Sequence, residues 1–454
     1  MLIARFFLCR EYCPKFSTHL ERATHLIELQ PLALSARRGD DQAMNNNTIW
    51  QRHPLVIIVL AQLCGTSLWF SVNGVGLSLS HDLGFSEVDL GRLTLAVQAG
   101  FICGTLLIAA TGLADRFRAS RIFAVSCLAG ALINAGFVLA AAQIPLALFL
   151  RFATGLCLAG IYPLGMKLVI GWTPKHTGAA LSWLVGMLTL GTALPHLLRG
   201  STLGMPWEWP LLGASLLALL GGAMIHALGD GPHLPPPAGK ASLAEGLSAL
   251  GQSRFRAVAG GYFGHCWELY AFWMLTPFLV MREVERLAAP TGLVSWLSFG
   301  VIALGLAGCV GGGMLSRRLG SLWVARRALT ASGAICLVYP LLPWAPPGLL
   351  LALLAIWGLT VIADSPQFSA LAAATAPRER IGSTLAVMNA VGFALTIPAI
   401  ALTTTLWSLQ GTWVVWWLLP GPVIGLWVLR GLVNVEALPP AAREGHSRPR
   451  IIGD

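Results

Sequence analysis

Charged side chains are scarce in this sequence: only 11% of its 454 residues are Asp, Glu, Lys or Arg, whereas 56% are hydrophobic. A soluble domain carries roughly 25% charged residues. This chain therefore has too few polar groups to cover its surface in water. The composition excludes an ordinary soluble globular protein and favours one whose helices are surrounded by lipid.

Motifs of several other protein classes are also missing. There is no nucleotide-binding loop of the form GxxxxGK[ST], so ATP does not drive the protein directly, and we expect no cofactor. The nine cysteines follow neither zinc-site nor disulfide spacing, and we expect no metal. The net charge of +10 comes from residues scattered between apolar stretches rather than from a basic run with interleaved aromatics. That distribution argues against a nucleic-acid partner.

The first 49 residues differ from the rest in being mixed in polarity. Arg5 and Arg10 interrupt the only apolar start, so the segment lacks the continuous apolar core of a signal peptide. Met44 opens "MNNNTIWQRHPLVIIVL", which is typical of a start before a first membrane span. We predict that residues 1–49 are an N-terminal extension, either disordered or an incorrectly assigned start, with Met44 as the initiator.

Apolar stretches of about 20 residues, long enough to cross a bilayer, occur twelve times. The first six cover 54–79, 88–111, 120–141, 146–170, 178–199 and 207–228. The second six cover 256–281, 291–315, 321–344, 347–371, 381–405 and 412–433. We predict an all-α membrane protein with one six-helix bundle at 50–228, a Pro-rich central cytoplasmic linker at 229–255, a second six-helix bundle at 256–433 and a cytoplasmic tail at 434–454.

Positive charges gather in the loops on one side of these spans. The opposite loops hold only Arg92, Arg199, Arg282 and Arg286, together with several acidic residues. Because positively charged loops stay in the cytoplasm, both termini are predicted to be cytoplasmic. The protein is then a multi-pass protein of the cell membrane, with the lipid bilayer as its surroundings, and we expect a monomer.

The two sets of spans repeat one another. Five residue pairs match at offsets of 202–204, each at the same ordinal position in its half, which indicates a parallel repeat about an axis along the membrane normal. The pairs are Leu113 and Leu315, Arg116 and Arg318, Pro163 and Pro366, Gly178 and Gly382, and Pro195 and Pro398. Tyr162, beside the first of these prolines, marks an expected bend in the fourth span.

Two motifs carry a resemblance to a known family. "TGLADRFRASR" between spans two and three contains Asp115, Arg116 and Arg121, and "RFATGLCLAG" in span four contains Arg151 and Gly155. With its six plus six spans, the chain resembles the major facilitator superfamily of secondary transporters from about residue 50 to residue 433. The resemblance implies alternating access, transport rather than catalysis, and interfaces between halves formed by spans two, five, eight and eleven.

The resemblance also implies a cytoplasmic gate formed by Asp115, Arg116 and Arg121, although these could be plain solvated loop charges. The first motif departs from the family pattern at Thr111 and Arg118, where glycines are usual. Small residues on the interface spans would allow close helix approach, and packing inside one half is the alternative. These residues are Gly100, Gly104, Gly186, Gly191, Gly305, Gly308 and Gly311.

Ionisable residues at membrane depth are expensive and are therefore candidates for function. Glu268 falls near the middle of span seven, and His265 three residues earlier lies on the same helix face. A carboxylate beside an imidazole can carry and release a proton, so we predict that this pair couples transport to H+. The alternative is a carboxylate held by a neighbouring helix for packing. Asp364 in span ten and Arg151 in span four are expected to contact the substrate or form a gate, since the resemblance places spans one, four, seven and ten around a central cavity.

Aromatic and amide side chains could line the same cavity. The candidates are Trp69 and Asn73 in span one and Trp267, Tyr270 and Trp273 in span seven. Core packing or lipid contact is the alternative. The sequence thus predicts a secondary active transporter that moves a small solute and H+. A drug or metabolite efflux antiporter, a transport-inactive sensor or scaffold, and a membrane enzyme using His265 and Glu268 are the alternatives.

Overall fold

The computed structural model describes residues 53–174, 177–234, 243–377 and 381–432, and these residues form helices and no strand. The predicted N-terminal extension and C-terminal tail, with Met44, lie outside the described residues. The first half comprises α4 (Pro54–Thr66), α5 (Ser71–Gly74), α6 (Gly76–Leu83), α7 (Glu87–Thr111), α8 (Leu113–Arg116), α9 (Ala119–Ala140), α10 (Ile144–Ala159), α11 (Tyr162–Trp172), α12 (Thr177–Ser201) and α13 (Glu208–Leu228).

The second half comprises α14 (Leu243–Ser248), η1 (Ala249–Gly251), α15 (Ser253–Arg286), α16 (Leu293–Leu319), α17 (Ser321–Val338), η2 (Tyr339–Leu341), α18 (Pro347–Thr360), α19 (Ser365–Thr375), α20 (Ile381–Gln410), η4 (Gly411–Trp417) and α21 (Pro420–Leu429). The segment before α15, predicted as part of the linker, contributes the short helix α14, which contacts α20.

Eight helical stretches of the described residues are long and apolar enough to cross a membrane by themselves. The last stretch, 384–429, holds the eleventh and twelfth spans: the chain turns at Gly411 after α20, and η4 followed by α21 forms the twelfth. Three further spans fall short of that measure for local reasons: the first is broken into α4, α5 and α6, the seventh has His265, Glu268 and several glycine, tyrosine and tryptophan residues in its middle, and the ninth is only 18 residues long with two arginines. The predicted twelve-span, all-α membrane fold is confirmed.

Three spans are interrupted near their middle. Span four breaks between α10 and α11, just before Pro163, as its sequence predicted, and span ten breaks between α18 and α19, just before Pro366. Proline lacks the backbone donor that a continuing helix needs but fits a first helical turn. Span one breaks at residues 67–70 although no proline lies there.

The loop between spans two and three is set by local signals at both ends of α7. Ser86 and Asp89 form a reciprocal capping box at its start, which satisfies free backbone donors. The helix ends at Gly112, whose φ of 62° is the left-handed conformation that glycine adopts readily. The short helix α8, with the predicted gate residues, follows directly.

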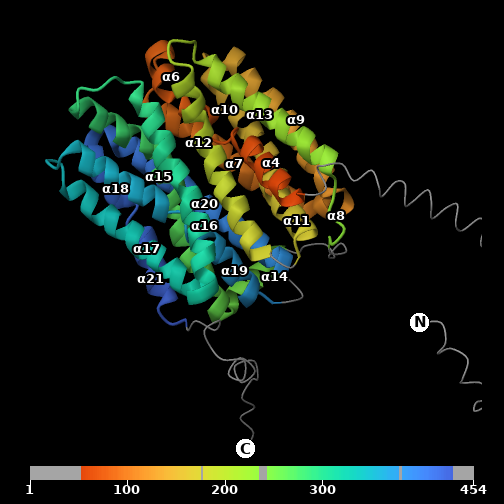
Figure 1. Cartoon of the computed structure of the whole chain (residues 1–454). Coiled ribbons are helices and arrows are strands. Elements are labelled where there is room, and N and C mark those ends of the chain that lie inside the picture. Colours follow the sequence, from red (N-terminus) through yellow and green to blue (C-terminus); the bar gives the residue numbers. More distant parts are fainter. Residues whose placement is uncertain (1–52, 175–176, 235–242, 378–380, 433–454) are drawn as a thin grey trace, which may run out of the picture. The chain divides into compact units, whose positions relative to one another are not determined.

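The halves meet through two helix pairs, α12 with α16 and α7 with α20 (Figure 1). A Cβ added to Gly186 would lie 2.6 Å from Leu306, and one added to Gly305 would lie 2.7 Å from Thr189, so these two glycines serve the interface as predicted. Gly104 instead faces Leu156 of α10 inside the first half. The remaining predicted positions divide as follows: Gly100, Gly191 and Gly308 pack inside one half, and Gly311 has nothing within 4 Å.

Close glycine contacts also repeat between the halves. A Cβ on Gly155 would overlap the carbonyl oxygen of Val97, and one on Gly358 would overlap that of Val301. The two glycines are 203 residues apart and the two valines 204, which matches the offset seen in the sequence. The contact between the second and fourth spans of each half is therefore the same feature used twice.

Large apolar side chains are exposed on α9, α13 and α21, which belong to the third, sixth and twelfth spans. Leu132 and Leu139 of α9, Leu216 of α13, and Ile424 and Trp427 of α21 are all more than half exposed. In water such a surface would aggregate, whereas hydrocarbon accepts it. Spans three, six and twelve thus face lipid along part of their surface.

Candidate functional site

Arg151 is buried beside the break in span one. The backbone carbonyls of Leu68 and Trp69, freed by the break, accept its guanidinium hydrogen bonds at 3.3 and 2.5 Å. The Ser71 hydroxyl and the Asn134 side-chain oxygen accept two more, at 3.1 and 3.3 Å. A broken backbone at membrane depth must be satisfied by protein. Arg151 supplies this, so it joins spans one, three and four inside the first half.

Glu268 occupies a comparable place in the second half. Its carboxylate accepts hydrogen bonds from the Ser332 hydroxyl at 2.9 Å, the Trp357 indole at 2.7 Å and the Cys336 thiol at 3.3 Å. These donors lie on α17 and α18, the ninth and tenth spans. Cys336 and Asn134, the partner of Arg151, are 202 residues apart. In each half a buried ionisable side chain therefore joins the first, third and fourth spans.

His265 has a different partner from the one that its spacing suggested. Its Nδ1 lies 2.7 Å from Oδ1 of Asp364, and both side chains are 1% exposed. The two atoms lie within ion-pair distance, in a contact that is charged only when the imidazole is protonated, and they are not aligned as a hydrogen bond. The expected pairing of His265 with Glu268 is corrected accordingly, because residues three apart share a face only broadly and neighbouring helices decide which way each one points.

Asp364 reaches His265 because of the break in span ten. It stands immediately before α19, at the cap position, where its side chain makes no capping hydrogen bond to that helix. The rings of Tyr262 and Phe368 lie 5.9 and 6.1 Å from the imidazole and enclose the pair. A histidine and a carboxylate are thus sealed between α15 and α19, away from bulk water.

An aromatic layer fills the space between the halves near the break in span one. We define this layer by its rings: Trp69, Phe70 and Phe101 from the first half, and Tyr270, Trp273 and Phe393 from the second. The Trp69 ring lies 5.6 Å from that of Tyr270 and 5.8 Å from that of Phe393. The Trp69 indole also donates to Gln98 at 2.9 Å.

The structure thus brings together Trp69, Tyr270 and Trp273, three of the four aromatic residues that the sequence singled out. Trp267 does not belong to the aromatic layer. Its indole donates to the carbonyl of Trp417 at 2.8 Å, so the ring packs toward η4 and α21 on the outside of the second half. This corrects its expected place in the cavity. Phe101 and Phe393 were not singled out, since a phenylalanine in an apolar span gives no signal of its own.

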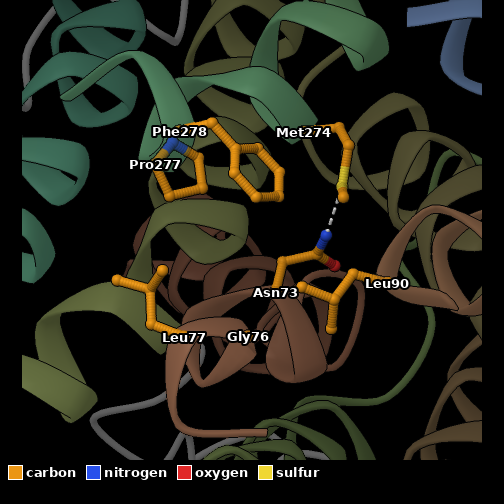
Figure 2. A pocket seen from close by; sticks show the side chains of 7 residues that line it. All are labelled: Asn73, Gly76, Leu77, Leu90, Met274, Pro277 and Phe278. Atoms are coloured by element: carbon orange, nitrogen blue, oxygen red, sulfur yellow. Dashed lines mark hydrogen bonds between the residues drawn. The ribbon is translucent and has the colours of Figure 1, made fainter. Parts of the chain in front are cut away.

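The side chain of Asn73 reaches from the first half to the second. Its amide donates to Thr94 at 2.9 Å and to the Met274 sulfur at 2.8 Å. Figure 2 shows this side chain pointing at Met274 across a small cavity. The cavity is lined by Asn73, Gly76, Leu77, Leu90, Met274, Pro277 and Phe278.

The bundle has two ends that differ in charge. We call the end that carries Arg116, Arg317 and Arg326 the arginine-rich end and the other the arginine-poor end. At the arginine-poor end an open groove of ≈ 940 Å³ lies between α6 and α12 of the first half and α15 and α16 of the second. Asp82 and Arg199 are among its lining residues. This groove and the cavity beside Asn73 both lie between the halves.

The predicted gate lies at the arginine-rich end. Arg116 and Arg121 are exposed, whereas the side chain of Asp115 lies outside what the structure describes. The ammonium of Lys167, on α11, donates to the carbonyl of Ala114 beside them. The loop is therefore tied to span four within the same half.

Asp230 is a structural residue that the sequence did not reveal. Its carboxylate accepts hydrogen bonds from the backbone nitrogens of Ala119 and Ser120, at 3.2 and 2.7 Å. It caps the start of α9 from a turn that is more than 100 residues away in sequence, and a negative charge suits that end of a helix. The sequence signal for such a cap is weak: an aspartate directly after the apolar stretch of span six.

Comparisons with known proteins agree with this architecture. The chain resembles the crystal structure of a bacterial homologue of the human lysosomal transporter Spinster, in an inward-facing, unoccupied conformation. The identity is 15% and the TM-score 0.65, with 85% of this chain and 98% of that one covered. It also resembles a partially occluded inward-open structure of the xylose transporter XylE from E. coli, at 14% identity and TM-score 0.68, covering 86% and 100% of the two chains.

At such identities the two structures establish the fold alone, and no curated protein sequence matches the chain. The family model of the Major Facilitator Superfamily matches residues 58–401, which is most of the chain. Together with the twelve spans and the repeated halves, this match assigns a multi-pass membrane protein that acts as a secondary transporter by alternating access. The chain belongs to the Major Facilitator Superfamily.

Proposed function

We propose that the protein moves a small solute together with protons, and that the buried pair of His265 and Asp364 binds and releases the proton. The observation that carries this proposal is the 2.7 Å approach of the two side chains, both of them enclosed in the protein. Histidine is the side chain whose charge changes most readily near neutral pH. No other described histidine lies within ion-pair distance of a buried carboxylate.

The chemistry links protonation to solvent access. A protonated His265 beside an ionised Asp364 has no net charge. Gain or loss of one proton by this pair leaves a single charge in a dry site. A buried, unpaired charge costs several kcal/mol. Proton exchange is therefore favoured only when rearrangement of the halves admits water to the break in span ten, which couples the proton to the transport cycle.

Glu268 is the second candidate for the proton site, supported by its burial at membrane depth. Its three donors from α17 and α18 also support the packing role, in which it holds spans seven, nine and ten together. The two roles make different predictions. A proton carrier must lose coupling when it is replaced by Gln, whereas a packing residue must lose stability.

The solute is proposed to bind between the halves, next to the aromatic layer. Trp69, Tyr270 and Asn73 lie where first-half and second-half side chains touch, so a bound molecule there would contact both halves. Arg151 is proposed as the clamp of span one rather than as a solute ligand, because carbonyl and side-chain oxygens already accept from both of its terminal nitrogens, Nη1 and Nη2. Asp115, Arg116 and Arg121 remain the proposed cytoplasmic gate, in a monomer of the cell membrane with both termini inside.

The experiment begins with a thermal-shift panel of metabolites and drug-like compounds on purified protein, because a ligand of the folded state raises its stability. The compound found is then assayed in proteoliposomes containing an internal pH dye. In the wild-type protein, solute flux should respond to an imposed pH gradient and move protons with it. Asp364→Asn should keep solute exchange at equal pH but lose the pH response.

Two further variants distinguish the alternatives. Glu87→Gln removes a carboxylate outside the buried sites and should behave as wild type. Glu268→Gln should keep the pH response if Glu268 has the packing role. Flux that ignores the pH gradient in the wild type would refute proton coupling, and a full pH response in Asp364→Asn would refute the assignment of the site.

A further inference from the structure

A cavity lined by arginines lies on the outside of the second half, far from the interface between the halves. It opens between α17 and α21 and has a volume of ≈ 930 Å³ including its mouth. Its lining residues are Leu322, Trp323, Arg326, Arg327, Thr330, Leu426 and Arg430. The two helices are the ninth and twelfth spans, and both reach the arginine-rich end here.

The guanidinium groups are held in place by neutral partners. Arg326 donates to the carbonyls of Leu429 and Leu432, at the end of α21. Arg327 lies over the ring of Trp323 at 5.3 Å, and Arg430 lies over a ring of its own helix at 5.0 Å. Among the described residues, no carboxylate lies within ion-pair distance of any of the three.

The residues around the cavity indicate that the negative charge balancing these arginines would come from the membrane. Trp323 is 37% exposed and Trp427 59%, and Val423 and Ile424 on the same helix are more than half exposed, so this face meets hydrocarbon. Exposed indoles near a helix end are typical of the boundary between lipid tails and headgroups. The cavity therefore lies at headgroup depth, with apolar side chains below the guanidiniums.

The first half provides an internal comparison. At the equivalent place, where its third span begins and its sixth span ends, the contact is made by the carboxylate of Asp230 on the backbone of α9. In the second half the same junction is made by Arg326 and is accompanied by two more arginines. The same junction is thus made by a carboxylate in the first half and by a guanidinium in the second.

We propose that this cavity binds the phosphate headgroup of an anionic phospholipid from the surrounding leaflet. Basic pockets between membrane helices suit such headgroups. The guanidiniums of Arg327 and Arg430 would donate hydrogen bonds to the phosphate oxygens, while Leu322 and Leu426 contact the apolar part of the lipid. Arg326 keeps α21 in place.

Native mass spectrometry of the full chain in mild detergent, titrated with phosphatidylglycerol or phosphatidylcholine, tests this. The variant Arg327→Gln/Arg430→Gln leaves Arg326 intact. An arginine near an anionic headgroup contributes about fivefold to binding, so the first phosphatidylglycerol should bind about 25-fold more weakly to this variant. Phosphatidylcholine should bind equally to both proteins.

The matched control is Arg317→Gln/Arg318→Gln, which removes the same charge from the end of α16 and should retain binding. Equal loss in the control would mean diffuse attraction and would overturn the proposal, as would unchanged binding in the cavity variant. Inorganic phosphate alone is tested by thermal shift. Phosphate could stabilise the wild type but not the cavity variant, while phosphatidylglycerol stabilises neither protein. In that case the site binds a free anion and the lipid assignment is wrong.

Discussion

The contact between Gly91 and Thr404 joins the halves at the arginine-poor end, and adding one methyl group to it should open that end. Gly91 lies on α7 and Thr404 on α20. A Cβ on Gly91 would lie 2.5 Å from the Thr404 hydroxyl oxygen, 2.9 Å from its Cβ and 3.1 Å from its methyl carbon. Non-bonded atoms prefer about 3.5–4.0 Å, so in Gly91→Ala the two helices must separate by about 1 Å.

The size of the effect follows from this overlap. An extra methyl in a well-packed contact costs about 1–3 kcal/mol. In an alternating-access transporter, only the conformation with this end closed contains the contact. The cost therefore falls on the closed state alone, and the population open at this end should rise about 5- to 150-fold.

The assay is the labelling rate of a cysteine placed one turn deeper in α7. Thr94 is 1% exposed and donates toward Met274 of the other half, so Thr94→Cys should react with a membrane-impermeant maleimide only when this end opens. Adding Gly91→Ala should accelerate labelling about 5- to 150-fold, in line with the larger open population. The same reporter protein without Gly91→Ala provides the reference rate.

Two controls separate opening from general loosening. Gly136→Ala, on α9 where nothing lies within 4 Å, should leave the labelling rate unchanged. Thr404→Gly removes the opposing side chain and should bring the rate of the Gly91→Ala protein back toward the reference. An unchanged rate in folded Gly91→Ala protein, or a failure of Thr404→Gly to restore it, would refute the idea that this contact holds the end closed.

Further predictions concern packing inside each half, with thermal unfolding in detergent as the measurement. Gly358→Ala should destabilise the protein by about 1–3 kcal/mol because its Cβ meets the backbone oxygen of Val301, which no rotamer can move, whereas Gly311→Ala should not. Arg151→Met should cost about 1–3 kcal/mol for each buried acceptor left unpaired; an unchanged Tm would contradict its role as a clamp. Glu268→Gln, which still accepts hydrogen bonds, should be milder than Glu268→Ala, and equal losses would exclude the packing role.

Much of the fold follows from hydrophobic length and from a few local signals. The twelve apolar stretches predicted the spans because a bilayer sets their length, and Pro163 predicted the bend in span four. The break in span one could not be predicted in this way. It has no proline, and it depends on a guanidinium from Arg151, more than 80 residues away, to satisfy its carbonyls.

The candidate site was only partly predictable for a related reason. Sequence identified His265, Glu268 and Asp364 as costly buried groups, because their depth in a span can be read from position alone. It could not assign their partners. The direction of each side chain is set by the helices around it, so Asp364, distant in sequence, takes the place beside His265, while Ser332 and other donors surround Glu268.

The distribution of polar contacts explains how two halves can rock without unfolding. Inside each half, strong contacts cross between spans: Arg151 joins spans one, three and four, Glu268 joins spans seven, nine and ten, and Asp230 and Arg326 tie the third span of their half to its sixth. Between the halves, the aromatic layer, a methionine sulfur and small residues make the contacts described above. Such contacts are individually weak, so they can be exchanged for others at modest cost. Hydrogen bonds to buried charges cannot be exchanged in this way, because breaking one strands the charge. The chain therefore concentrates its rigid contacts within the bodies that move and its replaceable contacts at the surface along which they move.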